Sequence, residues 1–131
     1  MIGADANILL RLLLNDDRAQ VAKLRSRLAK ALDAREEVFI GPIALAETVW
    51  TLTHRLKVPT SALAEAVRDL GLTRPFKFFD DAIVQSALDL FEAGKTGFSD
   101  CLIRVMDAQA GCTETLTFDR RALTMPGFSR P

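Results

Sequence analysis

The feature that most constrains the fold is the alternation of short apolar segments with longer stretches whose apolar residues recur at helical spacing. Four segments have the length and composition of strands, and they lie at about residues 1–4, 38–40, 76–79 and 113–118. The stretches between them predict helices, which begin or end at turn-forming residues such as Gly41-Pro42, Gly71 and Gly94. Strands separated by helices imply a parallel sheet covered on both faces and joined by right-handed crossovers. We therefore predict an α/β fold, a three-layer α/β/α sandwich with a central, mostly parallel sheet.

The size of the chain indicates one domain that spans residues 1–131. A chain of 131 residues with 49% hydrophobic content can bury a substantial core, and it is too short for two ordinary domains. Its 17 basic and 17 acidic residues cancel, so no overall positive field would hold long stretches of nucleic acid. Any contact with nucleic acid would therefore be local.

The start of the sequence carries neither a membrane span nor the pattern of a signal peptide. The apolar stretch from Ile8 to Leu14 is interrupted by Arg11, and Asp5 occupies the place of a positively charged leader. We expect a cytoplasmic protein without a membrane-spanning segment.

The cysteines and the histidine do not suit a disulfide or a zinc site. Cys101 and Cys112 fall on one predicted helix, whose rise would hold them roughly 16 Å apart, too far for a disulfide bond. Together with His54, the only histidine, they are too few for the usual nitrogen and sulfur ligands of zinc. A metal ion in this protein would need oxygen ligands.

Four acidic residues stand where a parallel sheet places its functional side chains. Asp5 directly follows the first predicted strand, and Asp119 directly follows the last. Asp100 opens the helix before that last strand, and Glu47 lies about one turn into the helix after the second. Because ligands of such sheets bind beyond the carboxyl ends of the strands, we expect the four acids to converge on one rim.

Carboxylates brought together in this way predict a divalent cation. Without compensation they would repel each other, and some would take up protons at neutral pH. All-oxygen ligands favour Mg²⁺ or Mn²⁺ over zinc or copper. Such an ion can activate a water and neutralise charge on a phosphodiester, so the predicted chemistry is hydrolysis of a phosphate ester.

Each acid also has a structural interpretation. Asp100 could only be a favourable charge at a helix start, and Asp119 could only cap the turn that follows it. Glu47 is harder to explain structurally, because its neighbours in the sequence are apolar, and Asp5 lies in a similar setting. The predicted convergence of all four favours a functional role.

Several segments of this chain resemble the PIN-domain family, and within it the VapC toxins of bacterial toxin–antitoxin pairs. The order and approximate spacing of the segments carry the resemblance, which covers nearly the whole chain. The segments are Gly3-Ala4-Asp5-Ala6-Asn7-Ile8-Leu9-Leu10-Arg11 with Asn15-Asp16-Asp17, then Ala46-Glu47, Phe98-Ser99-Asp100 and Thr117-Phe118-Asp119-Arg120.

The resemblance implies a Rossmann-like sandwich and a Mg²⁺- or Mn²⁺-dependent endoribonuclease that cleaves RNA. It also implies a homodimer that is inhibited by a small antitoxin protein. By motif, the acidic quartet would be Asp5, Glu47, Asp100 and Asp119, with Asp5 and Asp100 the more dependable metal ligands. Two further positions would support the ligands or the water, and these are Asn7 and Thr117.

The end of the chain departs from the family pattern. The family usually adds a final strand after the last motif, but residues 123–131 contain Pro126, which weakens any strand. We expect that strand to be short or absent.

Two other kinds of function are open to a chain with this pattern. Another metal-dependent phosphohydrolase is one, although a haloacid-dehalogenase-type phosphatase would need a second aspartate where this chain has Asn7. A catalytically inactive PIN-like module that binds proteins is the other. Because all four candidate acids are present, the sequence favours an active enzyme.

Overall fold

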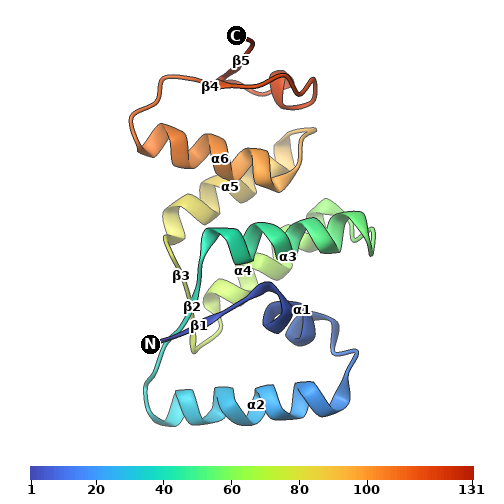
Figure 1. Ribbon diagram of the computed structural model, residues 1–131, viewed down its shortest axis with the longest axis vertical. Coiled ribbons are helices and arrows are strands. Elements are labelled where there is room, and N and C mark those ends of the chain that lie inside the picture. The colour runs from blue at the N-terminus through green and yellow to red at the C-terminus, as the bar shows by residue number, and fades with distance from the viewer.

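The computed structural model describes all 131 residues and confirms the α/β class, with six helices and parallel strands. The order of elements matches the predicted alternation (Figure 1). The elements are β1 (Ile2–Ala4), α1 (Ala6–Leu14), α2 (Arg18–Asp33), β2 (Val38–Ile40), α3 (Pro42–His54), α4 (Thr60–Leu72), β3 (Phe76–Phe78), α5 (Asp81–Ala93), α6 (Phe98–Gln109), β4 (Thr115–Leu116), the 3₁₀ helix η1 (Ala122–Thr124) and β5 (Phe128–Ser129).

The first three strands form a parallel sheet in the order β1-β2-β3. Ala4, Ile40 and Phe78 are aligned across this sheet and are all buried in the core. On the opposite face Gly3 and Lys77 are exposed. Phe39, which lies between them on that face, is half-buried.

The last two strands form a separate parallel pair, β4 with β5. The final strand that the sequence left short or absent is present, with two residues, because Pro126 lies before it and removes no donor from the ladder. This pair does not join the first sheet. Figure 1 shows it at one end of the long axis, beyond α5 and α6, with α3 between those helices and β1.

A hydrogen-bond network fastens β4 to α6. Arg104 Nη1 donates to Thr115 Oγ1 at 2.8 Å, and Arg104 Nη2 donates to the carbonyl oxygen of Cys112 at 3.3 Å. Thr115 Oγ1 in turn donates to Asp107 Oδ2 at 2.8 Å. The place of β4 in the molecule is therefore set by α6 and not by β1.

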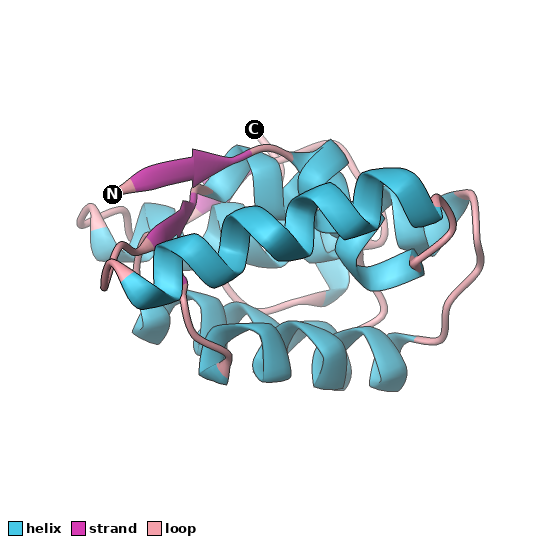
Figure 2. Ribbon diagram, turned by 90° about the horizontal axis from the view of Figure 1, so that it is seen from below, coloured by secondary structure: helices cyan, strands magenta, loops and turns pink.

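One hydrophobic cluster of 24 buried residues runs through the molecule from Ala4 to Met125. Most of the chain is helical, and the strands of the first sheet lie together at one side (Figure 2). No helix combines the length and the apolar character needed to cross a membrane.

Candidate active site

Asp5 lies at the junction of β1 and α1 and is exposed. Its Oδ1 accepts a hydrogen bond from the amide of Ile8 at 3.0 Å, so the carboxylate caps the N-terminus of α1. Its Oδ2 accepts no hydrogen bond from the protein. The cap therefore fixes the side chain and leaves one oxygen available for a ligand.

Asp100 lies in the first turn of α6 and is half-buried. Its Oδ2 accepts a hydrogen bond from Thr96 Oγ1 at 2.7 Å, and Thr96 itself is buried. Sequence reasoning did not single out Thr96, although a hydroxyl residue four positions before the acid was the available signal. Thr96 orients Asp100 and leaves Oδ1 without a protein partner.

Asp119 lies in the loop between β4 and η1 and is exposed. Its Oδ1 accepts hydrogen bonds from the amides of Arg121 at 2.7 Å and Ala122 at 3.1 Å, so it has the capping role that we considered for it. The amide of Asp119 donates to Thr117 Oγ1 at 3.0 Å. Because β4 ends at Leu116, Asp119 follows the strand after two further residues and not directly.

Glu47 lies on the exposed side of α3 and has neither a hydrogen bond nor an ion pair from its side chain. It lines a groove of about 510 Å³ between α1, α3 and α6, together with Asn7, Trp50 and Ser99. This groove brings two of the predicted residues together, Glu47 and Asn7.

A second hollow of about 250 Å³ brings together another two, Asp100 and Asp119. Trp50 and Ser99 line both hollows, so the two lie next to each other along α3 and the start of α6. Asp5 lines neither of them. Arg121 also lines the second hollow, but its Nε donates to the carbonyl oxygen of Lys95 at 2.8 Å and not to a carboxylate.

The structure brings the four acids together only in part, so their convergence on one metal site stays a prediction. No group of three histidine, cysteine, aspartate or glutamate side chains is close enough to hold a metal ion. The physical reason is that β4 pairs only with β5, so the ends of β1 and β4 do not lie at the same edge of one sheet.

The family model described as the PIN domain matches residues 3–127. The chain belongs to the PIN domain family. No curated protein sequence matches it. PIN domains are generally nucleases, and they usually use divalent metal ions. The match therefore supports the nuclease-type fold that the sequence resemblance implied.

The oxygens available in this PIN domain fit a hard divalent cation by their chemistry. Asp5 Oδ2, Asp100 Oδ1, Asp119 Oδ2 and the carboxylate of Glu47 accept no hydrogen bond from the protein. Carboxylate oxygens are the ligands that Mg²⁺ and Mn²⁺ prefer. The set of ligands fits, but one chain in this arrangement does not gather three of them.

The thiol next to Asp100 is not a candidate ligand in this PIN domain. Burial raises the pKa of Cys101 to about 11, and the charge of Asp100 adds to the effect. Since the thiolate is the form that binds metal or attacks a substrate, Cys101 is inert at neutral pH.

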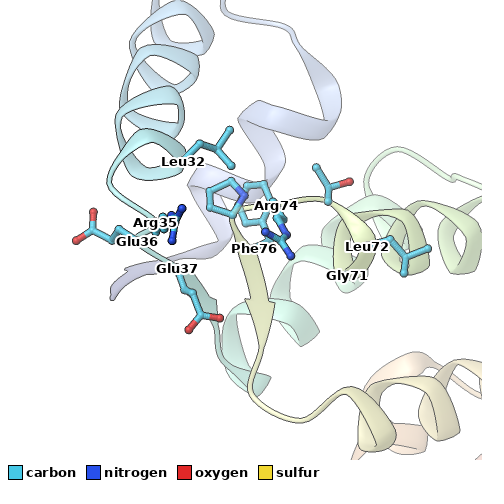
Figure 3. Close-up of a pocket in the computed structure, with 10 residues that line it drawn as sticks. Leu32, Arg35, Glu36, Glu37, Gly71, Leu72, Arg74 and Phe76 are labelled. Carbon is cyan, nitrogen blue, oxygen red and sulfur yellow. The ribbon is translucent and has the colours of Figure 1, made fainter.

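A third hollow, larger than these two, lies elsewhere and has a volume of about 690 Å³ (Figure 3). It borders the N-terminal ends of β2 and β3, where Glu36 and Arg74 line it. Glu36 is paired with Arg27 at 2.7 Å, and this hydrogen bond lowers the pKa of its carboxyl group. Because ligands of parallel sheets bind at the other end of the strands, this hollow is not the candidate site.

Proposed function

We propose that this PIN domain is a Mg²⁺- or Mn²⁺-dependent endoribonuclease whose ion is held by Asp5, Glu47, Asp100 and Asp119. The observation that carries the proposal is that none of these four carboxylates has a lysine or arginine partner within ion-pair distance. Asp100 and Asp119 line the same hollow without such a partner. Acids that line one hollow without an ion pair to the protein suit a bound metal ion.

The proposed roles follow from what each side chain contacts. Asp5 and Asp100 are the main ligands, since a hydrogen bond fixes each of them and leaves one oxygen available. Asp119 acts through water or a second ion, and Glu47 completes the set. Thr117 holds the backbone at Asp119, and Asn7 lines the groove beside Glu47. When bound, the ion supplies a Lewis acid that lowers the pKa of a water and neutralises charge on a phosphodiester.

Recognition of RNA would be local, because the chain has no net charge. Arg55 lines the groove with Glu47, and Arg121 lines the hollow with Asp100 and Asp119, so each of the two hollows contains a cation for a phosphate. Trp50 lies between the two hollows and is 49% exposed, which makes its ring available to stack on an unpaired base. We therefore propose single-stranded RNA as the substrate.

The enzymatic test uses two substitutions that keep size and remove charge, Asp5→Asn and Asp100→Asn. Each should lower the rate of cleavage of a labelled single-stranded RNA about 100-fold or more, because a lost ligand costs at least as much as a lost outer-shell partner. A chelator should abolish cleavage by the wild-type protein, and added Mg²⁺ or Mn²⁺ should restore it. Asp81→Asn is the matched control, since Asp81 is an exposed acid at the start of α5. Wild-type rates in both site variants would rule out the proposed site.

A role as the toxin of a toxin–antitoxin pair, acting in the cytoplasm, is a separate part of the proposal. Expression of the wild-type chain should arrest growth, and the Asp100→Asn variant at the same protein level should not. Co-expression of a small protein encoded beside it should relieve the arrest by binding the chain. An arrest that no neighbouring protein relieves would contradict the toxin role and leave the nuclease activity untouched.

One observation favours a second candidate, a PIN module that binds proteins without catalysis. The four acids are spread over two hollows and a helix cap, which is how acids without a shared metal would lie. This candidate predicts that Mn²⁺ neither binds to the protein nor supports cleavage. Cleavage of a simple phosphate monoester but not of RNA would instead indicate another metal-dependent phosphohydrolase.

A further inference from the structure

The third hollow, at the N-terminal ends of β2 and β3, contains two arginines that have no partner in the chain (Figure 3). Arg35 follows α2, and Arg74 follows α4. Both are exposed, neither takes part in an ion pair, and neither guanidinium group donates a hydrogen bond. The backbone amide of Arg74 also makes no backbone hydrogen bond. The volume of about 690 Å³ lies in the range of pockets that bind small molecules.

The two acids of this hollow are already paired with cations that do not line it. Glu36 accepts a hydrogen bond from Arg27 at 2.7 Å, and it lies 3.9 Å from the N-terminal amino group. Glu37 lies 3.5 Å from the amino group of Lys77. Each acid therefore has a cation of its own. The charges of the two arginines are left without a counter-ion in the chain.

A structural role at the ends of the helices is the alternative explanation for these arginines. Cations are favourable at helix C-termini, and α2 and α4 both end at this hollow. The chain's own amides and hydroxyls already bind the last carbonyl groups of both helices, among them those of Ala31, Leu32, Asp69 and Leu70. Neither guanidinium group donates to any of these carbonyl groups. The helix ends are therefore satisfied without the two side chains.

The backbone at Arg35 has a conformation that favours glycine. Its φ of 54° lies in the left-handed region, which a residue with a side chain adopts at a cost. The amide of Glu36 bonds to the carbonyl oxygen of Ala31 at 2.8 Å, and the amide of Arg35 bonds to that of Leu32 at 3.1 Å. Helices that end with this pair of bonds commonly have glycine where this chain has Arg35. An arginine kept at such a position indicates a use for its side chain.

Apolar side chains line the same hollow as the two charges. Leu32 is 47% exposed and Leu72 is 85% exposed, and Phe76 lies buried behind them. Exposed leucines beside unpaired arginines suit a ligand that has an apolar body and an anionic group. The charge indicates which anion fits, because a phosphomonoester carries about −1.5 to −2 at neutral pH and so matches two arginines. A single carboxylate would neutralise only one of them.

We propose that the third hollow binds a small organic phosphomonoester, whose phosphate contacts Arg35 and Arg74 and whose apolar part lies against Leu32 and Leu72. Guanidinium groups bind phosphate oxygens through parallel pairs of hydrogen bonds, which fits two arginines without other partners. None of the four candidate acids lines this hollow. The site is therefore separate from the proposed nuclease site, and it needs no metal ion.

Calorimetric titration with phenyl phosphate tests the site, in a chelator so that no metal ion holds the phosphate elsewhere. The wild-type protein should bind phenyl phosphate, and Arg35→Gln and Arg74→Gln should each raise the Kd about tenfold or more, because each removes a charged hydrogen-bond donor. Arg25→Gln is the matched control and should leave the Kd unchanged, since Arg25 on α2 is exposed, has no ion pair and does not line the hollow. Urea unfolding checks that all three variants are folded. No binding by the wild type, or an unchanged Kd in both hollow variants, would overturn the proposal.

Two more probes test the chemical class of the ligand. Benzoate, with the same ring and a single negative charge, should bind several-fold more weakly than phenyl phosphate. Leu72→Ala should raise the Kd of phenyl phosphate about threefold and leave that of inorganic phosphate unchanged, because only the ring contacts the leucine. Equal affinities for benzoate and phenyl phosphate, or an unchanged Kd of phenyl phosphate in Leu72→Ala, would overturn the assignment to an apolar phosphomonoester. Since these titrations contain neither RNA nor metal, their outcome is independent of the nuclease proposal.

Discussion

At the scale of single residues, three of the four candidate acids already have a structural partner. Asp5 caps α1 through one carboxylate oxygen, Asp119 accepts the amides of Arg121 and Ala122 in the turn that follows it, and Asp100 accepts the hydroxyl of Thr96. Such bonds restrict rotation of the side chain and keep the second oxygen in a defined direction. The structural and the functional interpretations of these acids are therefore compatible. Glu47 is the one acid of the four whose side chain makes no polar contact with the protein.

Thr96 should act as a positioning residue for Asp100. In Thr96→Val the hydroxyl is lost at nearly constant volume, so Asp100 is no longer held, and the rate of RNA cleavage should fall about tenfold. The lost hydrogen bond should also lower the free energy of unfolding by about 1 kcal/mol. Thr96→Ser keeps the hydroxyl and should rescue kcat. Steady-state kinetics and urea unfolding check both effects, and a valine variant with unchanged kcat would contradict the positioning role.

At the scale of elements, the sequence predicted the helices well, because their limits depend on nearby residues. Asp17 and Asp80 cap α2 and α5 with their side chains, and Pro42 begins α3. The last long strand was predicted over residues 113–118, but only Thr115–Leu116 form β4. A strand is as long as its neighbours allow, and which neighbour it has depends on contacts far along the chain. The pattern of residues within the segment does not contain that information.

The turn before β5 depends on Gly127, which has a φ of +90° and lies against the side chain of Arg104. Gly127→Ala should lower the free energy of unfolding by about 3 kcal/mol, from backbone strain together with displacement of Arg104. Gly111→Ala is the matched control, since Gly111 has a φ of +98° and open space around it. In Gly111→Ala the free energy of unfolding should fall by only about 1 kcal/mol, which is the cost of the left-handed conformation for alanine. Equal losses in urea unfolding would show that contact with Arg104 does not matter.

At the scale of the whole molecule, the α/β class could be predicted because short apolar segments alternate with stretches of helical spacing. That alternation does not show how close together the candidate site residues lie. The sequence orders Asp5, Glu47, Asp100 and Asp119 along the chain, but their distances depend on which strand edges pair. We expected β1 and β4 to end at one edge of one sheet, but in the structure they belong to two separate sheets.

The continuous core predicts that the chain unfolds as one unit. Leu88 on α5 is fully buried within the cluster that runs from Ala4 to Met125, and Leu88→Ala should lower the free energy of unfolding by about 3 kcal/mol. Calorimetric and van't Hoff enthalpies should remain equal in this variant, because no part of the core is independent. Leu72→Ala, at an exposed position, should change the free energy of unfolding by less than about 0.5 kcal/mol. Two separate transitions would instead indicate two units.

Trp50 is the only tryptophan of the chain, and its ring lies 4.8 Å from that of His54, at the boundary between the two acidic hollows. The molecule thus carries a single indole fluorophore at the place where metal and RNA are proposed to bind. Entry of either ligand changes the polarity around a half-exposed indole, so emission can be followed during a titration without any dye or tag. Trp50, which lines both hollows, would therefore report on the binding of either ligand.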